Sequence, residues 1–212
     1  MMLHWLTGEA TENHRQQIAT RAIFFLAGLG MAAWAPLIPF VKARLAIDDG
    51  TLGLLLFCLA AGSMAIMPFA GYLIGKLGCR TVLLGAGVLL CIDLPLLALL
   101  DVPLLMGVAL GVFGAVNGIM DVAMNSQAIV VERESGQAKM SGFHGFYSLG
   151  GIAGAGGISL LLLLGIVPAL AIGLIVVLIA ILLPIVAGDL LTYGGIGERC
   201  RGGVRLALAH GK

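Results

Sequence analysis

The chain has 212 residues, of which 60% are hydrophobic and only 11% are charged, with 12 Lys and Arg residues against 11 Asp and Glu residues. An average soluble domain carries roughly 25% charged residues, so this composition excludes a soluble globular domain and indicates that lipid surrounds most of the chain. The net charge of +1 offers no basic surface for a nucleic acid, which we exclude as a partner.

Apolar stretches long enough to cross a bilayer occur six times along the chain. Crossing about 30 Å of hydrocarbon takes roughly 20 apolar residues in a helix, because lipid offers the backbone no hydrogen-bond partners. The sequence therefore predicts an all-α membrane protein with six transmembrane helices. Its expected parts are an N-terminal cytoplasmic segment (1–20), a six-helix bundle (21–188) and a Gly- and Arg-rich cytoplasmic tail (189–212). The expected spans are residues 21–41, 51–74, 82–100, 103–130, 143–165 and 167–188.

Basic residues are distributed unequally between the two sides of such a bundle. Lys42 and Arg44 lie on one side, and ten basic residues lie on the side of the termini. Since Lys and Arg accumulate in cytoplasmic segments, we expect both termini to be cytoplasmic and the protein to lie in the inner membrane. The ten are Arg15, Arg21, Lys76, Arg80, Arg133, Lys139, Arg199, Arg201, Arg205 and Lys212.

Trp34, Pro36 and Pro39 interrupt the outer end of the first expected span. Carbonyls that proline leaves free, together with an aromatic ring, can line a cavity. Anchoring of Trp34 at the membrane interface is the alternative. In the third span, Asp93 precedes Pro95, and we expect its carboxylate to reach the outer interface rather than a site.

A polar stripe marks the fourth expected span. At 100° per residue, Asn117, Asp121 and Asn125 fall within an arc of about 80°. A charge within a membrane span is costly and is normally kept for a pathway or a proton relay, so Asp121 is the leading candidate for the solute or proton pathway. The alternatives are that Asp121 is hydrated near the cytoplasmic end and that the two Asn residues only bond to adjacent helices.

Glycines at short spacing indicate close helix packing in two spans. In the fourth span they stand beside the polar stripe, and in the fifth they share one face. The first set is Gly107, Gly111, Gly114 and Gly118, and the second is Gly150, Gly154 and Gly157.

The entry to the fifth span carries His144, Tyr147 and Ser148, which we place near the same pathway. A histidine there can titrate near neutral pH and take part in proton coupling, or it can simply order the preceding loop. The four cysteines and four histidines have no metal-ligand spacing, and no nucleophile stands at a recognisable spacing from a base. We therefore expect no metal, no cofactor and no enzyme.

The segment GYLIGKLGCR, with Gly71, Lys76, Gly78 and Arg80, resembles the cytoplasmic-loop signature of the major facilitator superfamily (MFS). The acidic position of that signature is Gly75 here, and one basic position is Cys79. We expect Gly71 and Gly78 to permit a tight turn and the two cations to hold the loop in the cytoplasm.

Two further segments, LGVFGAVNGIMDVAMN and FHGFYSLGGIAGA, resemble the branch that contains YbjJ-type inner-membrane proteins and is related to fucose permeases. The resemblance covers about residues 21–188. It implies one MFS-type bundle of two inverted three-helix repeats, equivalent to the amino-terminal half of a twelve-helix transporter. It also implies that Asp121 matches an acidic residue used in proton coupling.

Two functional hypotheses follow. The first is proton-coupled transport of a small polar solute, sugar-like or another metabolite, across the lipid bilayer. The second is a half-transporter that moves nothing alone and acts structurally or with a partner half. A homodimer or a separate C-terminal half would supply the missing bundle.

Overall fold

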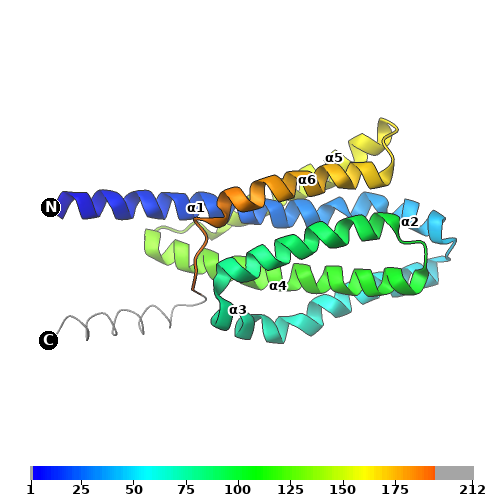
Figure 1. Ribbon diagram of the computed structural model, residues 1–212, viewed down its shortest axis with the longest axis horizontal. Coiled ribbons are helices and arrows are strands. Elements are labelled where there is room, and N and C mark those ends of the chain that lie inside the picture. The colour runs from blue at the N-terminus through cyan, green and yellow to red at the C-terminus, as the bar shows by residue number, and fades with distance from the viewer. Residues whose placement is uncertain (1, 194–212) are drawn as a thin grey trace.

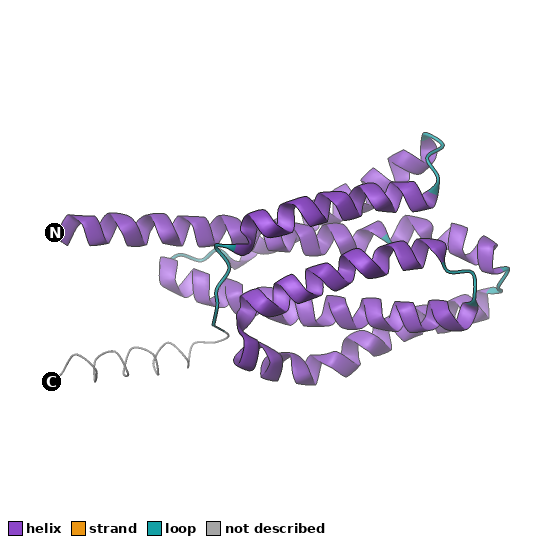
Figure 2. Ribbon diagram, in the orientation of Figure 1, coloured by secondary structure: helices purple, strands orange, loops and turns teal. Residues whose placement is uncertain are grey.

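The computed structural model describes residues 2–193, and within this range the regular structure is entirely helical (Figure 2). The helices lie roughly side by side along the long axis of the molecule (Figure 1). In chain order they are α1 (Met2–Ala33), the short 3-10 helix η1 (Ala35–Leu37), α2 (Ile38–Leu45), α3 (Asp49–Leu99), α4 (Pro103–Ser135), α5 (Met140–Leu163) and α6 (Pro168–Ala187).

The expected interruption of the first span is confirmed. α1 ends at Ala33, and η1, which contains Pro36, separates it from α2. Proline has no N–H to donate and its ring crowds the preceding turn, so the helix tightens and then restarts. α1 also begins much earlier than residue 21, so the expected N-terminal segment is helical.

α3 spans 51 residues and contains one residue outside the helical region, Gly78, with φ 81° and ψ 157°. The chain reverses direction there (Figure 1), so α3 consists of a first arm (residues 49–77) and a second arm (residues 79–99). These arms extend the second and third expected spans. Gly71, expected to share the turn, instead lies inside the first arm without a positive φ, because the helix continues for two further turns before Gly78.

Two closely packed helix pairs form the body of the bundle: α1 with α5, and the first arm of α3 with α4. At both interfaces, glycine lets a neighbouring backbone approach. A Cβ atom at Gly28 would lie 2.0 Å from the carbonyl oxygen of Tyr147, and one at Gly114 would lie 1.9 Å from that of Leu59. α6 packs mainly on α3, where a Cβ atom at Gly87 would meet the side chain of Leu183.

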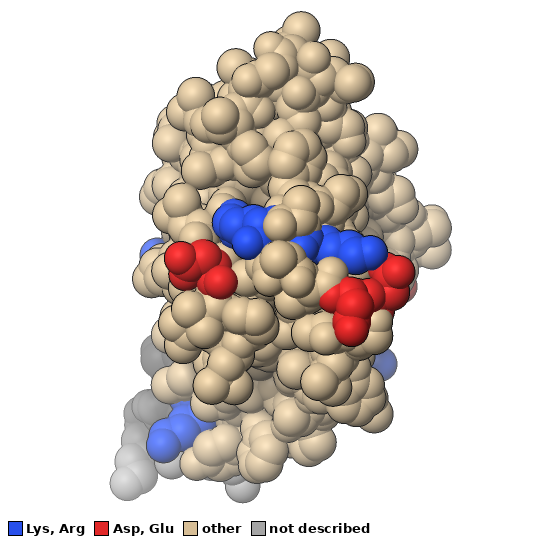
Figure 3. All heavy atoms as spheres, turned by 90° about the vertical axis from the view of Figure 1, so that its right-hand side faces the viewer, with Lys and Arg blue, Asp and Glu red and all other residues tan. Residues whose placement is uncertain are grey.

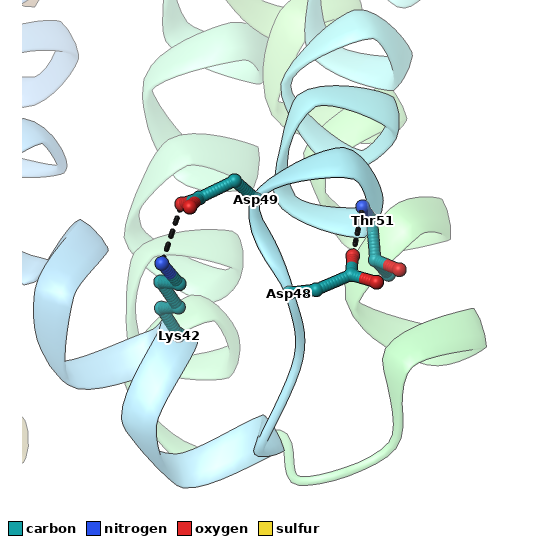
Figure 4. Close-up of polar contacts among 4 residues, drawn as sticks. All are labelled: Lys42, Asp48, Asp49 and Thr51. Carbon is teal, nitrogen blue, oxygen red and sulfur yellow. Dashed lines mark hydrogen bonds and ion pairs between the residues drawn. The ribbon is translucent and has the colours of Figure 1, made fainter.

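Charged groups gather at the end of the molecule where α2 lies (Figure 3). Lys42 pairs with Asp49, and Asp48 caps α3 by accepting a hydrogen bond of 2.7 Å from the Thr51 amide (Figure 4). This amide N–H holds the pKa of Asp48 below its usual value. Arg44 donates to the carbonyl oxygens of Leu97 and Ala98 and so joins α2 to the end of α3.

The segment after α6 packs against the opposite end of the bundle. Leu191 is buried, its N–H donates to Oε1 of Gln127 at 3.3 Å, and its carbonyl accepts from the Arg80 N–H at 2.8 Å. The hydroxyl of Tyr193 donates to Glu134 at 2.9 Å. Residues 189–193, the start of the expected tail, therefore pack on the bundle, because apolar Leu190 and Leu191 are buried there. Residues 194–212 lie outside the described residues.

The surface of the bundle is apolar over most of its length. Leu104 and Leu163, for example, are 77% and 84% exposed. Within residues 2–193, five helical segments are long and apolar enough to cross a membrane, and one of them is the 51-residue α3. Exposed apolar side chains at this density are typical of a surface that lipid covers.

Candidate functional site

A cavity of about 170 Å³ lies where α1, the first arm of α3, α4 and α5 meet. Its polar lining consists of Ser63, Asn117, Asp121 and Tyr147. Ala27, Gly118 and three flexible methionines, Met31, Met67 and Met124, complete the lining. The site therefore combines one carboxylate, one amide and two hydroxyls with an adaptable apolar wall.

Asp121 and Asn117 line this cavity from α4, one turn apart, as the polar stripe predicts. The third member of the stripe, Asn125, is not part of the lining, but its Nδ2 donates to Oδ1 of Asp121 at 3.2 Å and to the Asp121 carbonyl at 2.9 Å. Nδ2 of Asn117 donates to the Phe113 carbonyl at 2.7 Å. The alternative that these Asn residues bond to adjacent helices is wrong, since both donate within α4.

Glycine packing sets the width of the cavity. Gly118 faces the Oγ of Ser63, which a Cβ atom at position 118 would approach to 2.9 Å. Gly28 lies under the backbone of Tyr147 and lets α5 approach α1. The same small residues that join the helices therefore bring Ser63 and Tyr147 opposite the polar stripe of α4.

The other two residues predicted at the entry of α5 lie beside the cavity but do not line it. His144 is exposed, and its ring packs edge-on against Phe24 with 5.3 Å between ring centroids. Ser148 is exposed and its hydroxyl donates to the His144 carbonyl at 3.2 Å. Of this trio, Tyr147 alone is in the lining.

Two polar residues in the half of the bundle near α2 lie outside the cavity and are buried. Trp34 is 3% exposed and is not among the lining residues. Asp93 is also 3% exposed, so the expectation that its carboxylate reaches the interface is wrong. The reason is its helical face: Asp93 shares the buried side of the second arm with Leu90 and Leu97.

The loop signature lies at the end of the bundle that also holds the segment after α6. The Lys76 ammonium stands 5.9 Å from the centre of the Tyr72 ring, and the Arg80 N–H binds Leu191. Gly78 makes the turn itself and faces the Thr192 carbonyl, which a Cβ atom there would approach to 2.1 Å. None of these residues lines the cavity.

Sequence reasoning did not identify Ser63, Met31, Met67 or Met124 as cavity residues. Ser63 serves two purposes, since it packs on Gly118 and lines the cavity. One signal was available in the sequence. Ala27 with Met31, and Ser63 with Met67, stand four residues apart and thus share a helical face.

Known proteins match this chain, although no family model does. An uncharacterized MFS-type transporter of Yersinia pestis is 58% identical over 180 residues, which is 85% of this chain and 47% of the relative. The chain is a homologue of an MFS-type transporter. It is also 37% identical over 131 residues to the membrane protein MosC of Rhizobium meliloti, covering 62% of this chain and 32% of that protein.

A third relative, an uncharacterized transporter of Sinorhizobium fredii, is 34% identical over 134 residues, or 63% of this chain and 36% of the relative. The chain thus spans less than half the length of each of these relatives. Homology to transporters and the apolar helices together identify an integral membrane protein.

Proposed function

We propose that this chain forms a transport bundle of the MFS type that moves a small polar solute, sugar-like or another metabolite, across the inner membrane. The observation that carries the proposal is the open cavity between four helices, with Asn117, Asp121 and Tyr147 in its lining. Hydroxyl and amide groups of a polar solute find both donors and acceptors there, and the methionine side chains adapt to its shape.

Asp121 is the proposed proton carrier of this transport. It is the one carboxylate in the lining, and among residues 13–193 no Lys, Arg or His lies within ion-pair distance of it. Asp121 is exposed at the cavity. A carboxylate that is carried without a counter-ion through the membrane interior costs about 2.5–3.5 kcal/mol on insertion scales, and binding a proton removes that cost. The Asn125 amide donates a hydrogen bond to this carboxylate at 3.2 Å. His144 and Ser148 lie beside the path, at the entry of α5.

The test is uptake into proteoliposomes under an imposed pH gradient, with labelled hexoses, starting with fucose. A gradient of one pH unit sustains about tenfold accumulation of a solute that moves with one proton, since 1.4 kcal/mol corresponds to a factor of ten. We expect Asp121→Asn to abolish accumulation of the solute under the pH gradient. Exchange of the solute across the membrane in the absence of a pH gradient is expected to remain. Asp101→Asn, which removes an exposed carboxylate outside the cavity, is the matched control. Proton-driven accumulation by Asp121→Asn at the wild-type level would remove the assigned role.

The proposed architecture is six crossings arranged as two inverted three-helix repeats, with Trp34 near the outer end of the path. The two arms of α3 supply two crossings, and the packing pattern supports the repeat. In such a repeat, α1 corresponds to α4, and the first arm of α3 corresponds to α5. The pair of α1 and α5 therefore corresponds to the pair of α4 and the first arm of α3, and glycines lie at the contacts of both pairs. Lys76 and Arg80 then hold the turn at Gly78 on the cytoplasmic side.

A transporter of this type needs a second bundle, and the chain spans 47% of its Yersinia pestis relative. We propose that a second copy of this chain or a separate C-terminal half supplies it. Crosslinking in native membranes through an Ile152→Cys variant, whose position is 71% exposed on α5, tests this assembly. A specific dimer or a heteromeric product is the expected result. A monomer that takes up no solute would support instead the alternative of a half-transporter without transport activity.

A further inference from the structure

Asp93 carries a carboxylate buried in the second arm of α3, and this carboxylate has no partner in the described part of the chain. The residue is 3% exposed, and its Oδ2 atom forms no hydrogen bond. Its helical face also carries Ala86, Leu90 and Leu97, all of them buried. The side chain therefore points into the bundle and away from lipid and water.

The helices that face Asp93 offer it apolar surfaces. On the α1 side, a Cβ atom at Gly30 would lie 2.4 Å from the Leu90 side chain, one turn before Asp93. On the α6 side, Gly87 meets Leu183, and the Cys91 thiol lies 4.0 Å from the Val176 carbonyl. The second arm is thus packed against apolar side chains of α1 and α6 within one or two turns of Asp93.

No ionisable residue occurs between Arg21 and Lys42 on the α1 side, within α6, or in α4 before Asp121. Asp121 and Asp93 stand at different depths in the bundle. Asp121 lies 18 residues, or about 27 Å, from the outer end of α4, whereas Asp93 lies about 9 Å from the outer end of α3. The charged groups at the same end of the second arm are Arg44, which is bound to the Leu97 and Ala98 carbonyls, and Asp101 beyond the helix end. The half-buried Cys91 thiol is the neighbouring titratable group on the same arm. Among the described residues, no cation forms an ion pair with Asp93.

A second unpartnered polar atom lies in the same layer of the bundle. The buried Nε1–H of Trp34 has no acceptor in the described chain. α1 and the second arm of α3 run in the same direction (Figure 1) and touch at Gly30 and Leu90. From that contact, Trp34 lies about 6 Å and Asp93 about 4.5 Å further along their helices, at a rise of 1.5 Å per residue. An indole donor and a carboxyl thus mark one polar layer within apolar surroundings.

We infer that Asp93 is a buried proton-binding site, separate from Asp121, whose carboxyl holds a proton when the protein lies in the membrane at neutral pH. An unpaired ionised carboxylate enclosed by apolar helices is strongly disfavoured, and a bound proton removes the charge without requiring a cation. This inference is independent of the proposed transport function, since it concerns only whether a proton is bound to the Asp93 carboxyl.

The test uses the full-length chain in liposomes and the lipid-soluble probe dicyclohexylcarbodiimide, which adds to protonated carboxyl groups and leaves a stable N-acylurea. We expect the adduct on the Asp93 peptide at pH 7, detected by mass spectrometry, and a decrease of at least tenfold as rising pH ionises the carboxyl. Asp93→Asn removes the adduct. Asp121→Asn is the matched control and leaves labelling of Asp93 unchanged, which separates this site from the proposed transport site.

Infrared spectroscopy of the wild-type chain, with isotope-labelled Asp, gives a second measurement that requires no variant to fold. A protonated carboxyl band at pH 7 that is absent from folded Asp93→Asn supports the inference. Two results would overturn it: a spectrum at pH 7 in which every Asp is ionised, or protection of Asp93 from the carbodiimide by sodium ions at constant pH. Sodium protection would assign the site to a metal cation instead of a proton.

Discussion

At the residue scale, the turn within α3 depends on a single backbone conformation. Gly78 has φ 81° and ψ 157°, a region that side-chain-bearing residues hardly populate. The residue is buried, and the Thr192 carbonyl occupies the space where a Cβ atom would stand. The turn and the segment after α6 therefore fit together only while position 78 lacks a side chain.

We predict that Gly78→Ala destabilises the folded chain. Backbone strain alone costs about 1–3 kcal/mol, and displacement of Thr192 adds to it. Thermal unfolding in detergent, followed by the loss of the monodisperse chromatographic peak, measures the effect. Gly136→Asn is the control, because Gly136 has φ 64°, which Asn tolerates, and open space around its Cα. Equal melting temperatures for both variants would show that the turn does not require glycine.

Predictability from sequence also differs from residue to residue. Helical periodicity placed Asn117 and Asp121 on one face of α4, and both line the cavity. The same periodicity does not reveal which neighbour covers a face, so it gave no sign that Asp93 and Trp34 are buried. Met31 and Met67 line the cavity only because α1 and α3 approach α4 there, which is a property of the tertiary packing.

At the element scale, glycine positions determine which helices pair. The series Gly107, Gly111, Gly114 and Gly118, spaced by four, three and four residues, packs on the first arm of α3 as the sequence predicts. Gly150 and Gly154 pack on α1 in the same way, but Gly157 faces open space. The spacing of the glycines therefore predicted which helix faces pack. How many glycines of a face touch the neighbouring helix depends on how the two helices cross.

We predict that Gly114→Ala loosens the pair formed by α3 and α4. Its new Cβ atom would lie 1.9 Å from the Leu59 carbonyl oxygen, a backbone atom that cannot rotate away, so the helices must separate at a cost of about 1–3 kcal/mol. Gly85→Ala, at an exposed helical glycine with open space, is expected to leave the melting temperature unchanged or raise it slightly. Thermal stability in detergent compares the two. A Gly114→Ala variant as stable as Gly85→Ala would contradict the close contact.

At the scale of the whole molecule, the fold sorts the connections between helices into two ends. The N-terminus, the turn at Gly78 and the connection between α4 and α5 lie at one end (Figure 1). α2, the connection between α3 and α4 and the connection between α5 and α6 lie at the other. Of the basic residues that the structure describes, the first end carries most, and the second carries Lys42 and Arg44 among acidic groups (Figure 3). This separation supports a cytoplasmic location for the first end.

Cysteine labelling tests this topology directly. We replace the four native cysteines by Ala, introduce single cysteines, and treat intact cells with a membrane-impermeant maleimide. Asp101→Cys and Leu164→Cys, at the connections after α3 and α5, are expected to react in intact cells. Gly75→Cys and Gln137→Cys are expected to react only after the membrane is permeabilised, because both positions are exposed at the basic end. The second arm of α3 crosses the bilayer if Gly75 and Asp101 differ in this way. Labelling of Gly75→Cys from outside would remove two crossings and, with them, the cytoplasmic turn at Gly78.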